Sequence, residues 1–314
     1  MSSPVCQDQA VFGPVPSRRL GRSLGVDLLI PKTCSLDCVY CELGPGGRPP
    51  TRTRSPQRDA DQVLGEVARR LAELDAPPDF ITLAGSGEPT LHAGLGRVIA
   101  GLKALCPARV AVLTNATLCP DPAVRAELRL ADVLAPSLDA ASQPVFRRIN
   151  RPAPGLEIAA IIAGLIALRR EHRGEFWLEV LLAAGYNDAD DELERIMAAA
   201  RRIGPDKVQL NTVVRPPAVP GVLPVDDARL KAIAAAFPVP AEVIAPPRAA
   251  GGGDRGALAD QVVEMTRRRP CTIHDIMAMA GLDRAGAEAL VAGLRAQGRL
   301  REEAFGTTQY YRGV

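Results

Sequence analysis

The chain has 314 residues, 47% of them apolar, and its 38 basic and 36 acidic residues give a formal net charge of +2. This composition is typical of a folded protein with a full hydrophobic core, and so small a net charge gives no general indication of a nucleic-acid partner. The N-terminus has no apolar run of signal-peptide length, and no apolar segment reaches 18 residues anywhere in the chain. We therefore expect a cytoplasmic protein with no membrane partner.

Short apolar runs alternate with amphipathic stretches through most of the chain. The apolar runs predict six strands, at 24–30, 79–85, 109–115, 132–139, 176–183 and 207–213. The amphipathic stretches predict helices at 60–75, 93–105, 121–130, 156–172, 189–203 and 226–236. Nearly continuous apolar strands that are each followed by a helix indicate a parallel sheet with covered faces. The sequence therefore predicts an α/β fold, a partial (β/α)6 barrel, with a doubly wound sheet as the alternative.

The pattern changes after a Gly-rich stretch. We expect a barrel domain at 1–248, a linker at 249–257 and a small domain at 258–314. The last segment reads as three helices followed by two strands around a glycine turn. That order is typical of a winged helix-turn-helix.

Three of the seven cysteines, Cys34, Cys38 and Cys41, form a C-x₃-C-x₂-C motif directly after the first predicted strand. A structural zinc site normally has four ligands from two close pairs, whereas the remaining cysteines stand alone. These are Cys6, Cys106, Cys119 and Cys271. Three thiolates on one loop, at the end of a barrel strand that carries chemistry, indicate an iron–sulfur cluster with one iron not bound by the protein.

Polar motifs follow the next three predicted strands. They are "GSGEPTLH" at 85–92, "LTNATL" at 113–118 and "APSLDAAS" at 135–142. Each can be read simply as turn residues that end a strand or start a helix. Their repeated position beside the cysteine motif favours a role in the same site.

The motif C-x₃-C-x-Y-C, with Tyr40 before the last cysteine, resembles that of the radical S-adenosylmethionine (radical SAM) superfamily. The resemblance implies that Cys34, Cys38 and Cys41 bind a [4Fe-4S] cluster whose free iron binds S-adenosylmethionine. One electron, from a flavodoxin or ferredoxin type of reductant, would then cleave the cofactor to methionine and a 5′-deoxyadenosyl radical.

The resemblance also implies which residues contact S-adenosylmethionine. "SGE" at 86–88 takes the place of the family's GGE-like motif, with Ser86 in place of the first glycine. The candidate contacts are Tyr40, Ser86, Gly87, Glu88, Pro89, Thr114, Asn115, Ser137 and Asp139.

Longer segments between residues 12 and 220 are similar to an iron–sulfur oxidoreductase subgroup related to the wybutosine-synthesis enzymes. These segments include "FGPVPSRRLGRSLGVDLLIPKTCSLDCVYCELG", "SLDA…FRRINRP" and "QLNTVVRPP". The wybutosine enzymes bind a second cluster through extra N-terminal cysteines, whereas this chain has only Cys6 upstream of the motif. We therefore do not predict the wybutosine reaction, and an RNA base stays an alternative substrate.

Polar residues in the later strands are candidate substrate contacts. Glu179 interrupts an apolar strand, and Lys207, Gln209 and Asn211 share one face of the last strand, ahead of Arg215. We select Glu179, Asn211 and Arg215 as contacts. A structural salt bridge, such as Glu179 with Lys207, is the alternative.

Arginines gather in the segments expected at the barrel mouth. They are Arg18, Arg19, Arg22, Arg48, Arg52, Arg54, Arg58, Arg147, Arg148, Arg151 and Arg215. If they converge, the entrance favours an anionic substrate, such as RNA phosphate or a carboxylate.

The sequence therefore predicts a radical SAM enzyme that abstracts hydrogen from an unidentified substrate. A function from another class is an iron–sulfur regulator that reads nucleic acid through the winged helix. Its recognition helix, 284–297, carries Arg284 and Arg295 but also Glu288, which is a weak signal for base recognition.

Overall fold

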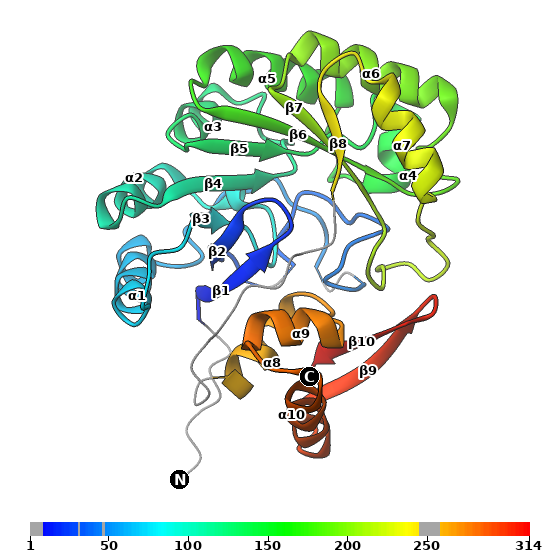
Figure 1. The fold of residues 1–314 in the computed structure, drawn as a ribbon. Coiled ribbons are helices and arrows are strands. Elements are labelled where there is room, and N and C mark those ends of the chain that lie inside the picture. Colours follow the sequence, from blue (N-terminus) through cyan, green and yellow to red (C-terminus); the bar gives the residue numbers. More distant parts are fainter. Residues whose placement is uncertain (1–8, 31, 46–47, 245–257) are drawn as a thin grey trace.

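The computed structural model describes residues 9–30, 32–45, 48–244 and 258–314. Its centre is an eight-stranded sheet in which strands follow one another in sequence order (Figure 1). The first two strands pair antiparallel and all later neighbours pair parallel. The strands are β1 (Val11–Ser17), β2 (Gly21–Val26), β3 (Phe80–Leu83), β4 (Arg109–Thr114), β5 (Val133–Pro136), β6 (Glu175–Leu182), β7 (Lys207–Thr212) and β8 (Ala241–Val243).

Helices cover the outer side of this curved sheet (Figure 1). They are α1 (Ala60–Ala72), α2 (Leu95–Leu105), α3 (Pro122–Leu128), α4 (Gln143–Asn150), α5 (Ile158–Glu171), α6 (Asp190–Ile203) and α7 (Asp227–Ala236), with a short 3₁₀ helix, η1 (Pro89–Leu91). Side chains of Asp59, Asp121 and Asp226 accept hydrogen bonds from the first backbone N–H groups of α1, α3 and α7. Among the described residues, no helix is long and apolar enough to cross a membrane.

The main core lies between the sheet and these helices, and Leu83, Val112, Leu134, Phe176 and Leu210 are fully buried in it. Burial on both faces explains why the strands read as continuous apolar runs. The six predicted strands correspond to β2–β7, and each of the six predicted helices is present. The sequential strand order with unpaired edges is that of a partial barrel; it rules out the doubly wound alternative, whose strand order reverses.

Two strands and one α-helix were missed by the sequence analysis, as was the short 3₁₀ helix η1. The strand β1 contains Pro14 and Pro16, which weaken its signal but are tolerated at a sheet edge. The edge strand β8 has only three residues, and α4 only eight. The first predicted strand, 24–30, also lies too far along the chain. Leu28 and Leu29 are buried in the loop after β2, so the apolar run continues beyond the strand.

The C-terminal unit, residues 258–314, has a small core of its own. It consists of α8 (Leu258–Arg268), α9 (Ile273–Ala280), α10 (Arg284–Ala296) and a hairpin of β9 (Leu300–Phe305) and β10 (Thr308–Gly313). The expected element order is therefore present. Its assignment as a winged helix and the domain boundaries stay predictions, and the expected linker at 249–257 lies outside the described residues.

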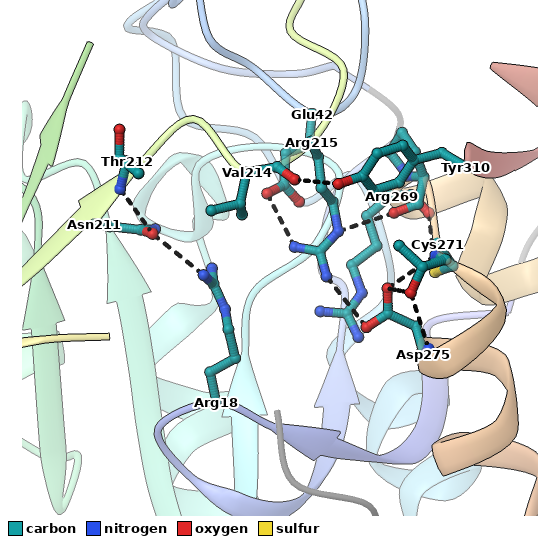
Figure 2. A network of polar contacts seen from close by, with 12 residues as sticks. Arg18, Glu42, Asn211, Thr212, Val214, Arg215, Arg269, Cys271, Asp275 and Tyr310 are labelled. Atoms are coloured by element: carbon teal, nitrogen blue, oxygen red, sulfur yellow. Dashed lines mark hydrogen bonds and ion pairs between the residues drawn. The ribbon is translucent and has the colours of Figure 1, made fainter. Parts of the chain in front are cut away.

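Polar contacts join this unit to the barrel (Figure 2). Arg215, which follows β7 and is only 5% exposed, lies 3.6 Å from a carboxylate oxygen of Asp275 on α9 and donates to Glu42 beside the cysteine motif at 3.2 Å. The hydroxyl of Tyr310 on β10 donates to the carbonyl oxygen of Val214 at 2.6 Å. The C-terminal unit is thus fastened directly to the carboxyl ends of the barrel strands.

Replacing Arg215 with Met should loosen this attachment. The change removes the donor to the Pro270 carbonyl oxygen at 2.9 Å and leaves Glu42 and Asp275 without their shared cation. Breaking a buried ion pair from one side costs about 3–5 kcal/mol, so we expect a loss of that size in the free energy of unfolding, measured in urea.

The matched control is Arg284→Met, which removes an exposed ion pair with Glu288 on α10 and should cost below about 0.5 kcal/mol. Equal losses in the two variants would show that the Arg215 contacts do not hold the unit in place.

Candidate functional site

The three cysteines of the motif line one cavity of about 430 Å³ at the carboxyl ends of the barrel strands. Cys34, Cys38 and Cys41 lie in the loop that follows β2, together with Tyr40, whose side chain also lines the cavity. The carboxyl ends of parallel strands are the usual position for chemistry in barrels of this kind. The position predicted for the motif is therefore confirmed.

Backbone hydrogen bonds hold the cysteine loop against the "GSGEP" loop that follows β3. The N–H of Lys32 donates to the carbonyl oxygen of Ser86 at 2.6 Å, and the N–H of Glu88 donates to that of Thr33 at 3.0 Å. A Cβ atom on Gly87 would collide with the Thr33 carbonyl oxygen, so this approach requires glycine. The two motifs are thus parts of one structure.

The carboxylate of Glu88 is buried and organises the ends of two neighbouring strands. It accepts hydrogen bonds from the hydroxyls of Thr90 and Thr114 and from the backbone N–H of Asn115, each at 2.6 Å. Burial raises the pKa of Glu88, although these bonds act to lower it. The side-chain amide of Asn115 then donates to the sulfur of Cys34 at 3.4 Å. Glu88 therefore positions the residue that contacts a cysteine.

The carboxylate of Asp139, which follows β5, likewise positions the residue that contacts the second cysteine, Cys38. Its carboxylate accepts from the Tyr40 hydroxyl, from the Asn150 amide at 2.8 Å and from the backbone N–H of Leu181 at 3.0 Å. Burial raises its pKa against the effect of these bonds. The Asn150 amide also donates to the sulfur of Cys38 at 3.4 Å. Two buried carboxylates thus each direct an asparagine amide toward a cysteine sulfur.

Burial also changes the acidity of the thiols themselves. It raises the pKa of Cys34 to about 12, and it raises the pKa values of Cys38 and Cys41 as well. A buried thiolate needs a compensating charge, which bound iron would supply. Among the described residues, no three Cys, His, Asp or Glu side chains converge on a single metal ion. In a cubane each thiolate binds a different iron, so its ligands do not have to meet at one point.

Two of the nine candidate cofactor contacts, Tyr40 and Gly87, line the cavity. The others are not among the residues that line it; the hydroxyl of one of them, Ser86, donates to Asp27 at 2.6 Å. This second group is Ser86, Glu88, Pro89, Thr114, Asn115, Ser137 and Asp139. Their direct contacts with a cofactor stay predictions.

All three candidate substrate contacts, Glu179, Asn211 and Arg215, line the same cavity. Glu179 forms an ion pair with Arg19 and accepts from the Asn211 amide at 3.1 Å. Burial acts to raise the pKa of Glu179, but the charges of Arg19 and Arg18 and the hydrogen bonds from Arg19 and Asn211 together lower it. Arg215 bridges the barrel and the C-terminal unit, so its guanidinium group already has partners.

The alternative of a structural salt bridge holds for Glu179, which pairs with Arg19, but the example partner Lys207 is wrong. Lys207 pairs with Glu242 of β8 at 2.7 Å, and the Gln209 amide donates to the same carboxylate at 2.8 Å. The period of two correctly put Lys207, Gln209 and Asn211 on one face, but they lie at different depths in the barrel. Only Asn211, near the carboxyl end of β7, lines the cavity.

The expected convergence of arginines is limited to three of the eleven, since only Arg18, Arg19 and Arg215 line the cavity. Others have partners elsewhere, as when Arg22 donates to the Ala76 carbonyl oxygen at 2.9 Å or Arg54 to that of Thr90 at 2.8 Å. Loop arginines cannot be oriented from sequence, because their partners are distant in the chain.

Sequence reasoning missed three residues of the site. Asn150 lies in the quoted "FRRINRP" segment, but nothing in the segment indicates that its amide reaches a cysteine. Arg268 and Arg269 follow one another at the end of α8 and line the cavity from the C-terminal unit. Their role depends on docking between two parts of the chain, which carries no local signal.

The isolated cysteines do not join the motif. Cys106 ends α2, Cys119 is buried in the main core, and Cys271 is buried in the core of the C-terminal unit. None of these three lines the cavity. Cys6 lies outside the described residues.

Comparisons with known proteins agree with this geometry. The model of the radical SAM superfamily matches residues 28–213. The chain is 40% identical over 210 residues to the UPF0026 protein slr1464 of Synechocystis sp., a match that covers 66% of this chain and 76% of that protein. It is also 33% identical over 297 residues to a Brachyspira hyodysenteriae protein named GTPase Obg, covering 93% of this chain but only 43% of that protein. This chain therefore spans less than half the length of that relative.

The fold is shared with a radical SAM methyltransferase from Sphaerobacter thermophilus. The TM-score is 0.53 at 20% identity, with 70% of this chain and 65% of that chain covered. The family match extends from the loop after β2 to the end of β7, which includes the cysteine motif, the "GSGEP" loop and the strand ends around the cavity. The chain belongs to the radical SAM superfamily, an enzyme class, and is related to the UPF0026 proteins.

Proposed function

We propose that this protein binds a [4Fe-4S] cluster through Cys34, Cys38 and Cys41 and cleaves S-adenosylmethionine reductively, to abstract hydrogen from a substrate. One observation carries the proposal: the three thiols of a family motif line a single cavity at the carboxyl ends of the barrel strands. A one-electron reductant of the flavodoxin or ferredoxin type and a cytoplasmic location belong to the same proposal.

The residues present fit such a cluster. Amides of Asn115 and Asn150 each lie 3.4 Å from a cysteine sulfur, where a donor stabilises the negative charge that a bound thiolate carries. When bound, the cluster supplies the electron that cleaves the sulfonium of S-adenosylmethionine, and the cofactor supplies the hydrogen-abstracting radical.

The chain's own contribution is to position these groups and to shield them from water. Leu36, Leu113 and Leu181 give the cavity apolar walls, which exclude solvent from the reacting groups. Glu179 on β6 and Asn211 on β7 line the cavity opposite the cysteine loop. Both side chains can orient a substrate by hydrogen bonds. Glu179 is held as a carboxylate by Arg19, so it acts as an acceptor.

The observations do not favour nucleic acid as the ligand. On α10, Arg284 pairs with Glu288 at 2.8 Å and Arg295 pairs with Glu302 at 2.6 Å, which neutralises both cations of the expected recognition helix. Reading bases requires side chains that are free to reach them. The RNA-modifying alternative, the similarity to the wybutosine-related subgroup and the nucleic-acid-binding regulator stay predictions from sequence.

Replacing Cys38 with Ala tests the proposed function directly. The anaerobically reconstituted wild-type protein should show a reducible iron–sulfur absorption and release 5′-deoxyadenosine from S-adenosylmethionine with dithionite. The variant should lose both, with cleavage falling by at least about a hundredfold, because one corner of the cluster has no ligand. Cys106→Ala, at the end of α2, is the matched control and should retain both. Full cleavage by Cys38→Ala would exclude this assignment.

The asparagine contacts make a separate, spectroscopic prediction. Asn150→Leu and Asn115→Leu each remove a hydrogen bond to a cysteine sulfur, and such bonds favour the more electron-rich reduced cluster. We expect the cluster's reduction potential to fall by on the order of tens of millivolts in each variant, measured by anaerobic redox titration with EPR. Gln143→Leu makes the same change on α4 away from the cysteines, and its potential should match the wild type. Unchanged potentials in all three variants would contradict the role given to the amides.

A further inference from the structure

Basic side chains outnumber acidic ones on the walls of the cavity that contains the three cysteines. The acidic residues that line it are Glu42 and Glu179. The basic ones are Arg18, Arg19, Lys32, Arg215, Arg268 and Arg269. The cavity volume, about 430 Å³, is within the range of small-molecule sites.

Four of these six cations have a carboxylate within 4 Å. The pairs are Arg19 with Glu179, Lys32 with Asp37, Arg215 with Glu42 and Asp275, and Arg268 with Glu264 and Asp27. Within the described part of the chain, Arg18 and Arg269 have no carboxylate at that distance. Neither guanidinium group therefore has a carboxylate in direct contact; the charge of Glu42, which pairs with Arg215, acts on both from further away.

Arg18 lies in the turn between β1 and β2 and points toward β7, where it donates to the side-chain oxygen of Asn211 at 3.2 Å (Figure 2). Burial lowers its pKa to about 10; Glu42 opposes the shift, whereas the like charges of Arg215 and Arg19 add to it. A guanidinium group that has lost water and faces other cations gains strongly from an anion.

Arg269 approaches the same cavity from the C-terminal unit (Figure 2). Among the described residues, its side chain has one hydrogen-bond contact, from a guanidinium nitrogen to the sulfur of Met265 at 3.7 Å, and sulfur is a weak acceptor. Its five donors are therefore largely unused. Arg18 and Arg269 come from opposite ends of the sequence, and docking of the C-terminal unit brings both to one cavity.

We propose that the guanidinium groups of Arg18 and Arg269 bind a phosphate or carboxylate group of a small-molecule substrate, so that the C-terminal unit completes the substrate site. This inference rests on the proposed function and names the class of its substrate. The planar guanidinium fork matches both kinds of oxyanion. The partner of Arg18, Asn211, is on β7, whereas the asparagines that contact cysteine sulfur follow β4 and end α4. Arg18 is therefore joined to one of the candidate substrate contacts rather than to a residue that contacts a cysteine sulfur.

A small molecule fits better than RNA because the C-terminal unit forms part of the cavity wall. Met265, Arg268 and Arg269 all line the cavity from that unit. On α10, Arg284 and Arg295 pair with Glu288 and Glu302, and neither arginine lines the cavity.

The test is calorimetric titration of the reconstituted full-length protein with inorganic phosphate and, separately, with acetate. Arg18→Gln and Arg269→Gln should each weaken the preferred anion about tenfold, the usual effect of losing one charged hydrogen-bonding partner. Whichever anion binds more tightly identifies the group as phosphate or carboxylate. Arg269→Lys, which keeps the charge but loses the fork, should lie between wild type and Arg269→Gln. The matched control, Arg284→Gln on exposed α10, should bind as wild type does.

S-adenosylmethionine affinity is measured in the same variants to distinguish the substrate from the cofactor, and the control Arg284→Gln should form 5′-deoxyadenosine with dithionite within about twofold of wild type. Unchanged anion affinity in both variants, or no binding of either anion to wild type at about 10 mM, would overturn the inference. A loss of S-adenosylmethionine affinity would assign the arginines to the cofactor instead, and binding of bulk tRNA that depends on Arg269 would assign them to RNA. If the wild type yields no 5′-deoxyadenosine while the arginine-dependent anion binding is present, the proposed function fails and the anion site stands.

Discussion

Two buried carboxylates hold the loop that carries the three cysteines. Glu88 follows β3 and Asp139 follows β5, and each accepts at least three hydrogen bonds from different segments of the chain. Burying a carboxylate is costly unless its oxygens accept hydrogen bonds. Glu88 and Asp139 therefore keep the segments that donate to them in one arrangement. That arrangement delivers one asparagine amide to Cys34 and another to Cys38.

This dependence explains why the polar residues at the strand ends are needed even where they do not line the cavity. Thr114 and Ser86 have their hydroxyl groups occupied by Glu88 and Asp27. They form a supporting layer beneath the cysteine loop, and a precise active site needs such a layer to keep its side chains in place. Arg215 supports the other side of the cavity, because it joins the loop after the cysteines to α9. The cavity is therefore built by both the barrel and the C-terminal unit.

Apolar runs in the sequence predicted the strands well where a run begins and ends close to the ends of the strand itself. Continuous apolar runs gave all six central strands, because a strand buried on both faces has few polar positions. The prediction was poorer at the edges, where β1 contains prolines and β8 is short, and after β2, where Leu28 and Leu29 are buried without being in a strand. The cysteine motif was placed correctly, since its position relative to β2 is set by the chain itself. The partners of Glu179 and Lys207 were wrong, because strand periodicity gives the face of a residue but not its depth.

The sequence by itself determined the order of the elements, the position of the three cysteines at a strand end and the family to which the chain belongs. These features depend on spacing along the chain, which the sequence contains directly. Only the tertiary structure decided that Asn115 and Asn150 contact cysteine sulfurs, that most of the loop arginines point elsewhere, and that Arg18 and Arg269 share a cavity. Each of these outcomes joins residues distant in the sequence, and packing and hydrogen bonding choose such partners from many that the sequence equally allows.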